Sequence, residues 1–112
     1  MERIPDDAIV VRGGRNRPED IRRGIGTHPS GVTGISVECG ERLSVEELSA
    51  SIPHRQVGVT TVGAIRAAGG DVIRTSGRSP QHATLTGLTP DEIGFLLNPT
   101  IPKSAQQLSE PE

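Results

Sequence analysis

Aromatic side chains are almost missing from this chain of 112 residues: Phe95 is the single one, and there is no Trp or Tyr. Large rings therefore cannot fill the core, and they cannot offer the stacking surface that single-stranded nucleic acids use. The core has to come from aliphatic side chains and closely packed glycines, within a hydrophobic fraction of 32%. The length is that of one domain, which argues against a two-domain enzyme with separate cofactor and substrate halves.

Cysteine is equally scarce. Cys39 is the only one, so neither an internal disulfide nor a cysteine-based zinc site can form. We expect this thiol to lie buried on an apolar strand face, as a small hydrophobic residue. No segment has the run of about 20 apolar residues of a membrane helix, and residues 1–7 lack the basic and then apolar pattern of a secretion signal. These absences predict a cytoplasmic protein, of a composition typical of bacteria, that binds no membrane.

An excess of positive charge is also lacking, since 12 basic residues stand against 14 acidic ones and the net charge is -2. Proteins that coat nucleic acids normally carry a strong basic excess, so nucleic acid is not the expected partner. The basic residues are unusual in kind, because only Lys103 is a lysine and all the others are arginines. Two explanations stay open: genomic base composition, or selection of the forked guanidinium group for anion binding.

The hydrophobic pattern predicts alternating strands and short helices, and hence an α+β fold. We expect a small two-layer domain over residues 1–98, with a short sheet of about four strands and three or four short helices. The predicted strands are residues 8–11, 32–39, 71–76 and 82–87. The predicted helices are residues 16–23, 44–52, 58–68 and 89–97. Residues 99–112 are polar and contain proline, which predicts a flexible tail.

Three of these helices have start signals of the kind that capping requires. Ser44 is followed three residues later by Glu47, and Thr89 is followed in the same way by Glu92, so both pairs match the capping-box pattern. Asn16 can cap the first helix, because a proline follows in its first turn.

The segment that joins the first strand to the first helix is the strongest candidate site. Its candidate ligand-binding residues are Arg12, Gly13, Gly14, Arg15 and Arg17, which we call the Arg/Gly turn. The two glycines let backbone amides approach a ligand, and the arginines supply forked donors near the start of a helix, where anions are favoured. The turn matches neither the dinucleotide fingerprint nor the P-loop. The alternative is a solvated turn whose arginines pair with neighbouring carboxylates such as Glu19 and Asp20.

The three histidines are too far apart in the sequence for a local metal motif, so no metal site is predicted. His54 and His28 are expected in exposed loops. His82 opens a predicted strand and shares one of its faces with Thr84, so both join the candidate ligand-binding residues. His82 and Arg12 are the candidates for catalysis. A neutral imidazole bonded to a turn carbonyl explains the position of His82 equally well.

The segment Ser79-Pro-Gln-His-Ala-Thr-Leu-Thr-Gly87 resembles an element found late in small uncharacterised bacterial proteins, Pro-x-His-Ala-x-Leu/Val-x-Gly. The likeness covers most of residues 4–97. It implies that His82 and the strand after it are central to the protein, and it implies no particular activity.

Residues 9–36 are similar to the opening of ADP-ribosyltransferase toxins. The likeness consists of a strand ending in Arg12-Gly13, the run Arg-Pro-Glu-Asp-Ile with Gly24 after it, and a strand containing Thr33 and Ser36. It implies that Arg12 holds the phosphates of NAD. The chain departs from that family, because residues 37–98 of the predicted domain, where the transferase glutamate belongs, contain no Glu-x-Glu or Gln-x-Glu element.

The sequence thus predicts a small cytosolic interaction or accessory protein with a protein partner, whose Arg/Gly turn binds a phosphate-bearing small molecule and which needs no cofactor. The alternative is a compact toxin-like enzyme, of the kind found in toxin-antitoxin pairs, that acts on NAD or RNA. Whether the protein is an enzyme stays open at this stage.

Overall fold

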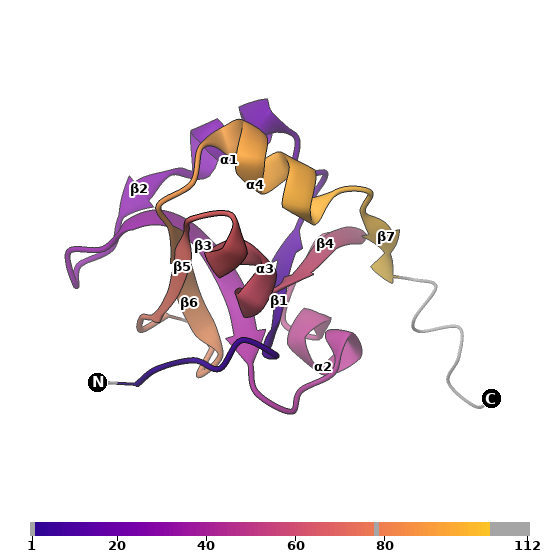
Figure 1. The fold of residues 1–112 in the computed structure, drawn as a ribbon. Helices are drawn as coiled ribbons and strands as arrows, with labels where there is room; N and C mark the ends of the chain where they lie inside the picture. The colour runs from indigo at the N-terminus through magenta and orange to yellow at the C-terminus, as the bar shows by residue number, and fades with distance from the viewer. Residues whose placement is uncertain (1, 78, 104–112) are drawn as a thin grey trace.

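Seven antiparallel strands form one sheet in the computed structural model, which describes residues 2–77 and 79–103 (Figure 1). The strands are β1 (Ile9–Gly13), β2 (Gly26–Thr27), β3 (Thr33–Gly40), β4 (Gln56–Thr61), β5 (Asp71–Arg74), β6 (His82–Thr86) and β7 (Ile101–Pro102). The helices are α1 (Pro18–Gly24), α2 (Val45–Ser49), α3 (Val62–Ala67) and α4 (Pro90–Leu97). The sheet order is β5-β6-β3-β1-β4-β7, and β2 pairs with β3 outside this path. The α+β class is confirmed, with more strands than the four expected.

The strand β1 is buried on both faces of the sheet, as expected from a short run of apolar residues without alternation. Val10 belongs to the larger core, together with residues of α1, α3 and α4. Val11 belongs to a smaller core with Leu48 and Val57. Because neighbouring residues of a strand point to opposite faces, α2 lies on the other side of the sheet from the remaining helices. The expected two-layer arrangement therefore has a third layer over β1 and β4.

The prediction of one helix over residues 58–68 is wrong in its first part, which is the strand β4. Residues 57–61 are mostly β-branched and pair with β1 over five positions, so sheet formation prevails over the helical spacing. The helix α3 begins only after Thr61, whose Oγ1 accepts a hydrogen bond of 3.1 Å from the Ala64 amide. The strand β4 is therefore available as the second neighbour of β1.

The sheet also extends into the predicted tail. Ile101 and Pro102 pair with Val57 and Gln56, so the chain is still part of the sheet at residue 102. Residues 104–112, the rest of the predicted tail, lie outside the described residues. None of the helices in the described ranges has the length and apolar character that crossing a membrane requires.

Both predicted capping boxes are present. The Glu47 amide donates to Ser44 Oγ at 3.1 Å, and the Ser44 amide donates to the Glu47 carboxylate at 2.8 Å. The corresponding distances between Glu92 and Thr89 are 3.2 and 2.8 Å. Hydrogen bonds with Ser44 hold the pKa of Glu47 below its ordinary value. The bond with the Ser44 backbone has the larger effect, and the bond with its side chain the smaller.

The lowered pKa of Glu47 predicts a stability difference that depends on pH. The ionised cap stabilises the folded state fully above the unfolded-state pKa of about 4.3, and this contribution is lost as the pH falls through the folded-state value. We expect Glu47→Gln to unfold at a lower urea concentration than the wild type at pH 7, and the two midpoints to converge below about pH 4. Glu46→Gln, the same charge change without a cap contact, is the control. A midpoint difference that is equal at pH 7 and pH 3 would contradict this account.

Gly34 in β3 predicts a packing effect. A Cβ atom here would overlap the backbone oxygen of Leu85 and lie 3.0 Å from Thr84 Cγ2, so Gly34→Ala must push β3 away from β6. We expect a loss of about 1–3 kcal/mol in the free energy of unfolding. The control is Gly26→Ala at the partner position in β2, where nothing lies within 4 Å of the added atom. Urea unfolding measures both, and equal midpoints for the two variants would refute the prediction.

Candidate functional site

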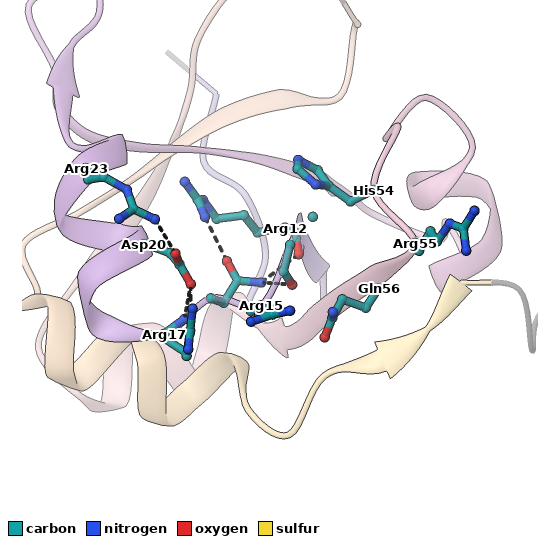
Figure 2. Close-up of a pocket in the computed structure, with 11 residues that line it drawn as sticks. Arg12, Arg15, Arg17, Asp20, Arg23, His54, Arg55 and Gln56 are labelled. Atoms are coloured by element: carbon teal, nitrogen blue, oxygen red, sulfur yellow. Dashed lines mark hydrogen bonds and ion pairs between the residues drawn. The ribbon is translucent and has the colours of Figure 1, made fainter.

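A cavity of about 470 Å³ opens at the end of β1, and the whole predicted Arg/Gly turn lines it (Figure 2). We call it the arginine pocket. Its lining residues are Arg12, Gly13, Gly14, Arg15, Asn16, Arg17, Asp20, Arg23, His54, Arg55 and Gln56. Five of these side chains are arginines and only Asp20 is a carboxylate, so the cavity has a strongly positive lining.

Asn16 shapes the turn that forms this pocket. It is fully buried and has a left-handed backbone with φ of 56°. Its Nδ2 donates to the backbone oxygens of Arg12 at 2.9 Å and Gly14 at 3.2 Å, and its Oδ1 accepts from Arg12 Nη1 at 2.8 Å. The prediction that Asn16 caps the first helix is therefore wrong: Arg17 is the capping residue, and its amide donates to the Asp20 carboxylate at 3.2 Å. The Asn16 side chain is used to hold the turn and Arg12 instead.

The Arg12 guanidinium is half-buried and its charge is not neutralised. Its Nε is buried and has no hydrogen-bond partner, and no carboxylate of the described residues lies within ion-pair distance of the group. Burial lowers the pKa of Arg12, and the charge of Asp20 opposes that effect. Arginine stays charged in proteins, so the group is a desolvated cation bonded only to a neutral amide. An anion beside it would relieve this cost.

The remaining arginines of the pocket fall into two groups. Asp20 pairs with Arg17 at 3.4 Å and with Arg23 at 2.5 Å. Burial raises the pKa of Asp20, but hydrogen bonds from Arg17 and the charges of both arginines outweigh it and leave the pKa below its ordinary value. Arg15 and Arg55 have no ion pair within the described part of the chain. The alternative of a turn neutralised by its own carboxylates thus holds for Arg17 and fails for Arg12 and Arg15.

His82 and Thr84 lie in a different cavity, of about 210 Å³, between the β2–β3 region and β6. We call it the histidine pocket. Its lining residues are Gly24, Gly26, Thr27, His28, Gly34, Ile35, Ser36, Ser76, His82 and Thr84. The structure therefore divides the predicted site residues between two cavities: the Arg/Gly turn in one, His82 and Thr84 in the other.

The two histidines of the histidine pocket differ in their bonding, although their ring centroids are 5.9 Å apart. His28 uses both nitrogens: Nδ1 accepts from the Ser30 amide at 3.0 Å, and Nε2 donates to the Ser76 oxygen at 2.6 Å. In His82, Nδ1 lies 2.9 Å from Thr75 Oγ1 and 3.3 Å from the Thr75 carbonyl oxygen. The carbonyl can only accept, which favours the proton on Nδ1. The lone pair of His82 Nε2 then has no partner among the described residues.

Sequence reasoning missed the residues that β4 and the loop before it bring to the arginine pocket. His54 was expected to face solvent, and it is exposed, but it also lines the cavity with Arg55 and Gln56. About 40 residues separate these positions from the Arg/Gly turn in the sequence, and only the pairing of β4 with β1 joins them. No local pattern could have identified them. Cys39, by contrast, is fully buried as predicted, and burial raises the pKa of its thiol to about 11.

Comparisons with protein-family models, curated proteins and solved structures found no match to the chain. The two likenesses noted in the sequence therefore stay predictions. Within residues 2–77 and 79–103, no group of three or more His, Cys, Asp or Glu side chains could hold a metal ion.

The role of Asn16 predicts different costs for two substitutions. Asn16→Ala removes three side-chain hydrogen bonds and leaves a side chain in the left-handed region, so we expect a loss of roughly 2–4 kcal/mol in the free energy of unfolding. Asn16→Gly removes the same bonds without the backbone strain, and its loss should be smaller by about 1 kcal/mol. Urea titrations measure both. Equal losses would mean that the backbone of the turn relaxes without Asn16.

Proposed function

We propose that this chain is a binding protein for a phosphate-bearing small molecule, which it holds in the arginine pocket. The observation that carries the proposal is the half-buried Arg12, whose only described partner is the neutral Asn16. Beside it lie Arg15 and Arg55, which have no ion pair within residues 2–77 and 79–103. A phosphate accepts two parallel hydrogen bonds from one guanidinium group, and such charge-assisted bonds are strong. The phosphate would supply the negative charge that this group of residues lacks.

The two glycines of the turn support the same function. Gly14 has φ of 95°, a conformation that other residues rarely adopt. A Cβ atom on Gly13 would lie 2.5 Å from side-chain atoms of both Ile52 and His54. A side chain here would therefore force the side chains of Ile52 and His54 to move.

The geometry supports binding better than catalysis. His82, the candidate for proton transfer, lines the other cavity, so no titratable histidine except the exposed His54 borders the arginine pocket. The enzyme acting on NAD or RNA stays an alternative proposal, and NAD belongs among the ligands tested. The protein partner also stays a prediction, because Phe95, although 83% exposed, is one side chain rather than an apolar patch.

Ligand-induced stabilisation tests the proposal. Pyrophosphate at ten times its Kd should stabilise the wild type by about 1.4 kcal/mol and raise Tm by several degrees, because it binds the folded state alone. Arg12→Gln should lose most of this rise. Arg22→Gln makes the same charge change on α1 outside the pocket and should keep it. Inorganic phosphate and NAD are run in parallel, and sodium chloride at the same ionic strength corrects for general salt effects.

Two results would overturn the proposal. One is the absence of any rise in Tm with phosphate, pyrophosphate or NAD beyond that seen with sodium chloride at the same ionic strength. The other is an equal loss of the Tm rise in Arg12→Gln and Arg22→Gln, which would show that the anions bind to the positive surface in general rather than in the pocket.

A further inference from the structure

The strands β1 and β3 separate beside the arginine pocket. They pair over three positions only, which end at Val11 and Glu38. Beyond this point β3 pairs with β2 at Gly34, whereas β1 continues beside β4 as far as Gly13. The sheet therefore has an opening between the last residues of β1 and the first half of β3.

Backbone groups point into this opening. The Cys39 amide donates to the Gln81 oxygen at 2.9 Å, so Cys39 faces β6, and the alternation of a strand turns Glu38 and Ser36 toward β1. The Gly14 amide donates to the Gln56 oxygen at 2.9 Å, so by the same alternation Gly13 faces β3. The amides and carbonyls of Gly13 and Ser36 have no strand partner across the opening within the described residues. Unpaired backbone groups beside a cavity are ready to bond a ligand.

The opening is a third cavity, of about 210 Å³, and it joins the other two. It shares Arg12, Gly13 and His54 with the arginine pocket, and Ser36 with the histidine pocket. Arg12 is central to the arrangement, because its Nη2 lies 2.5 Å from where a Cβ of Gly24 would stand, and Gly24 lines the histidine pocket. The three cavities are thus neighbours, with the opening between the arginine pocket and the histidine pocket.

The arginine pocket differs in charge from the opening and the histidine pocket. The arginine pocket is positive, whereas the acidic Glu38 is one of the residues that line the opening, and its Oε1 accepts a hydrogen bond from Ser79 Oγ at 2.6 Å. Glu38 pairs with His82 across the sheet, and Ser36 pairs with Thr84, so these four polar side chains share one face. The opening and the histidine pocket together offer hydroxyl groups, a carboxylate and the lone pair of His82 Nε2. These groups suit the hydroxyl groups of a ligand, and the carboxylate repels phosphate.

We infer that the ligand is a phosphorylated sugar, with its phosphate in the arginine pocket and its hydroxyl groups in the opening and the adjoining histidine pocket, bonded by Glu38 and Ser36 in the former and by His82 in the latter. The inference rests on the proposed function. No Phe, Tyr or Trp lines any of the three cavities, so a nucleobase could stack only on histidine or arginine there, and the test below includes a nucleotide. The matching of charge sets the direction in which the ligand lies.

Calorimetric titration with ribose 5-phosphate and with inorganic phosphate tests the inference. The sugar phosphate should bind the wild type about tenfold more tightly than phosphate, the gain of two or so net hydrogen bonds. Glu38→Gln should lower the affinity for ribose 5-phosphate several-fold. Its affinity for inorganic phosphate should be unchanged or higher, because a repulsive negative charge is removed. A Glu38 variant that does not fold is replaced by Ser36→Ala, which should weaken the sugar phosphate alone. Arg12→Gln should weaken both ligands.

The outcomes separate the two proposals. Equal affinities for ribose 5-phosphate and phosphate, or equal effects of Glu38→Gln on both, would overturn the sugar phosphate and leave the phosphate pocket intact. Binding of neither ligand would overturn the proposed function as well. Adenosine 5′-monophosphate distinguishes a free sugar phosphate from a nucleotide: an affinity equal to that of ribose 5-phosphate supports the inference, and binding tenfold tighter overturns it in favour of a nucleotide.

Discussion

The backbone hydrogen bonding of β1 is the constraint on which the rest of this structure depends. A buried strand has to satisfy its amides and carbonyls on both sides, and β1 does so with β4 along its whole length but with β3 for three positions only. The separation of β3 leaves Gly13 and Ser36 facing one another without a bond. Because the turn after β1 begins at the same place, the opening in the sheet and the arginine pocket are neighbours and share Arg12, Gly13 and His54.

Three segments far apart in the sequence hold this corner together. Asn16 comes from the turn, and Gly58 from β4 lies so close that an added Cβ would be 3.0 Å from Asn16 Nδ2. The same Cβ would be 2.5 Å from the backbone oxygen of Leu97 at the end of α4. Asn98, just beyond α4, donates from its Nδ2 to the backbone oxygen of Asn16 at 2.8 Å. Such close packing keeps Arg12 in place although no carboxylate in the described part of the chain lies within ion-pair distance of it.

Local interactions could be predicted from the sequence, and distant ones could not. The capping boxes at Ser44 and Thr89 involve residues three positions apart, so the pattern and the bonds coincide. The pattern of residues 58–68 predicts a helix because its valines and small residues suit both a helical and a strand spacing. Only the hydrogen bonds that β1 offers to residues 57–61 decide in favour of the strand β4. Asn16 was assigned to the helix end for a similar reason: a capping residue and a turn-forming residue look alike without their partners.

The sequence by itself determined the α+β class, the buried β1, the buried Cys39 and the presence of arginines and glycines in one turn, since each follows from composition or from residues near one another in the chain. The tertiary structure decided which of those arginines keep an unneutralised charge and which other side chains join them. It also placed His82 in a neighbouring cavity and opened the sheet between β1 and β3. These features depend on the pairing of segments some 20 to 70 residues apart, and contacts of that range are specified by the packing of the whole core rather than by any local pattern.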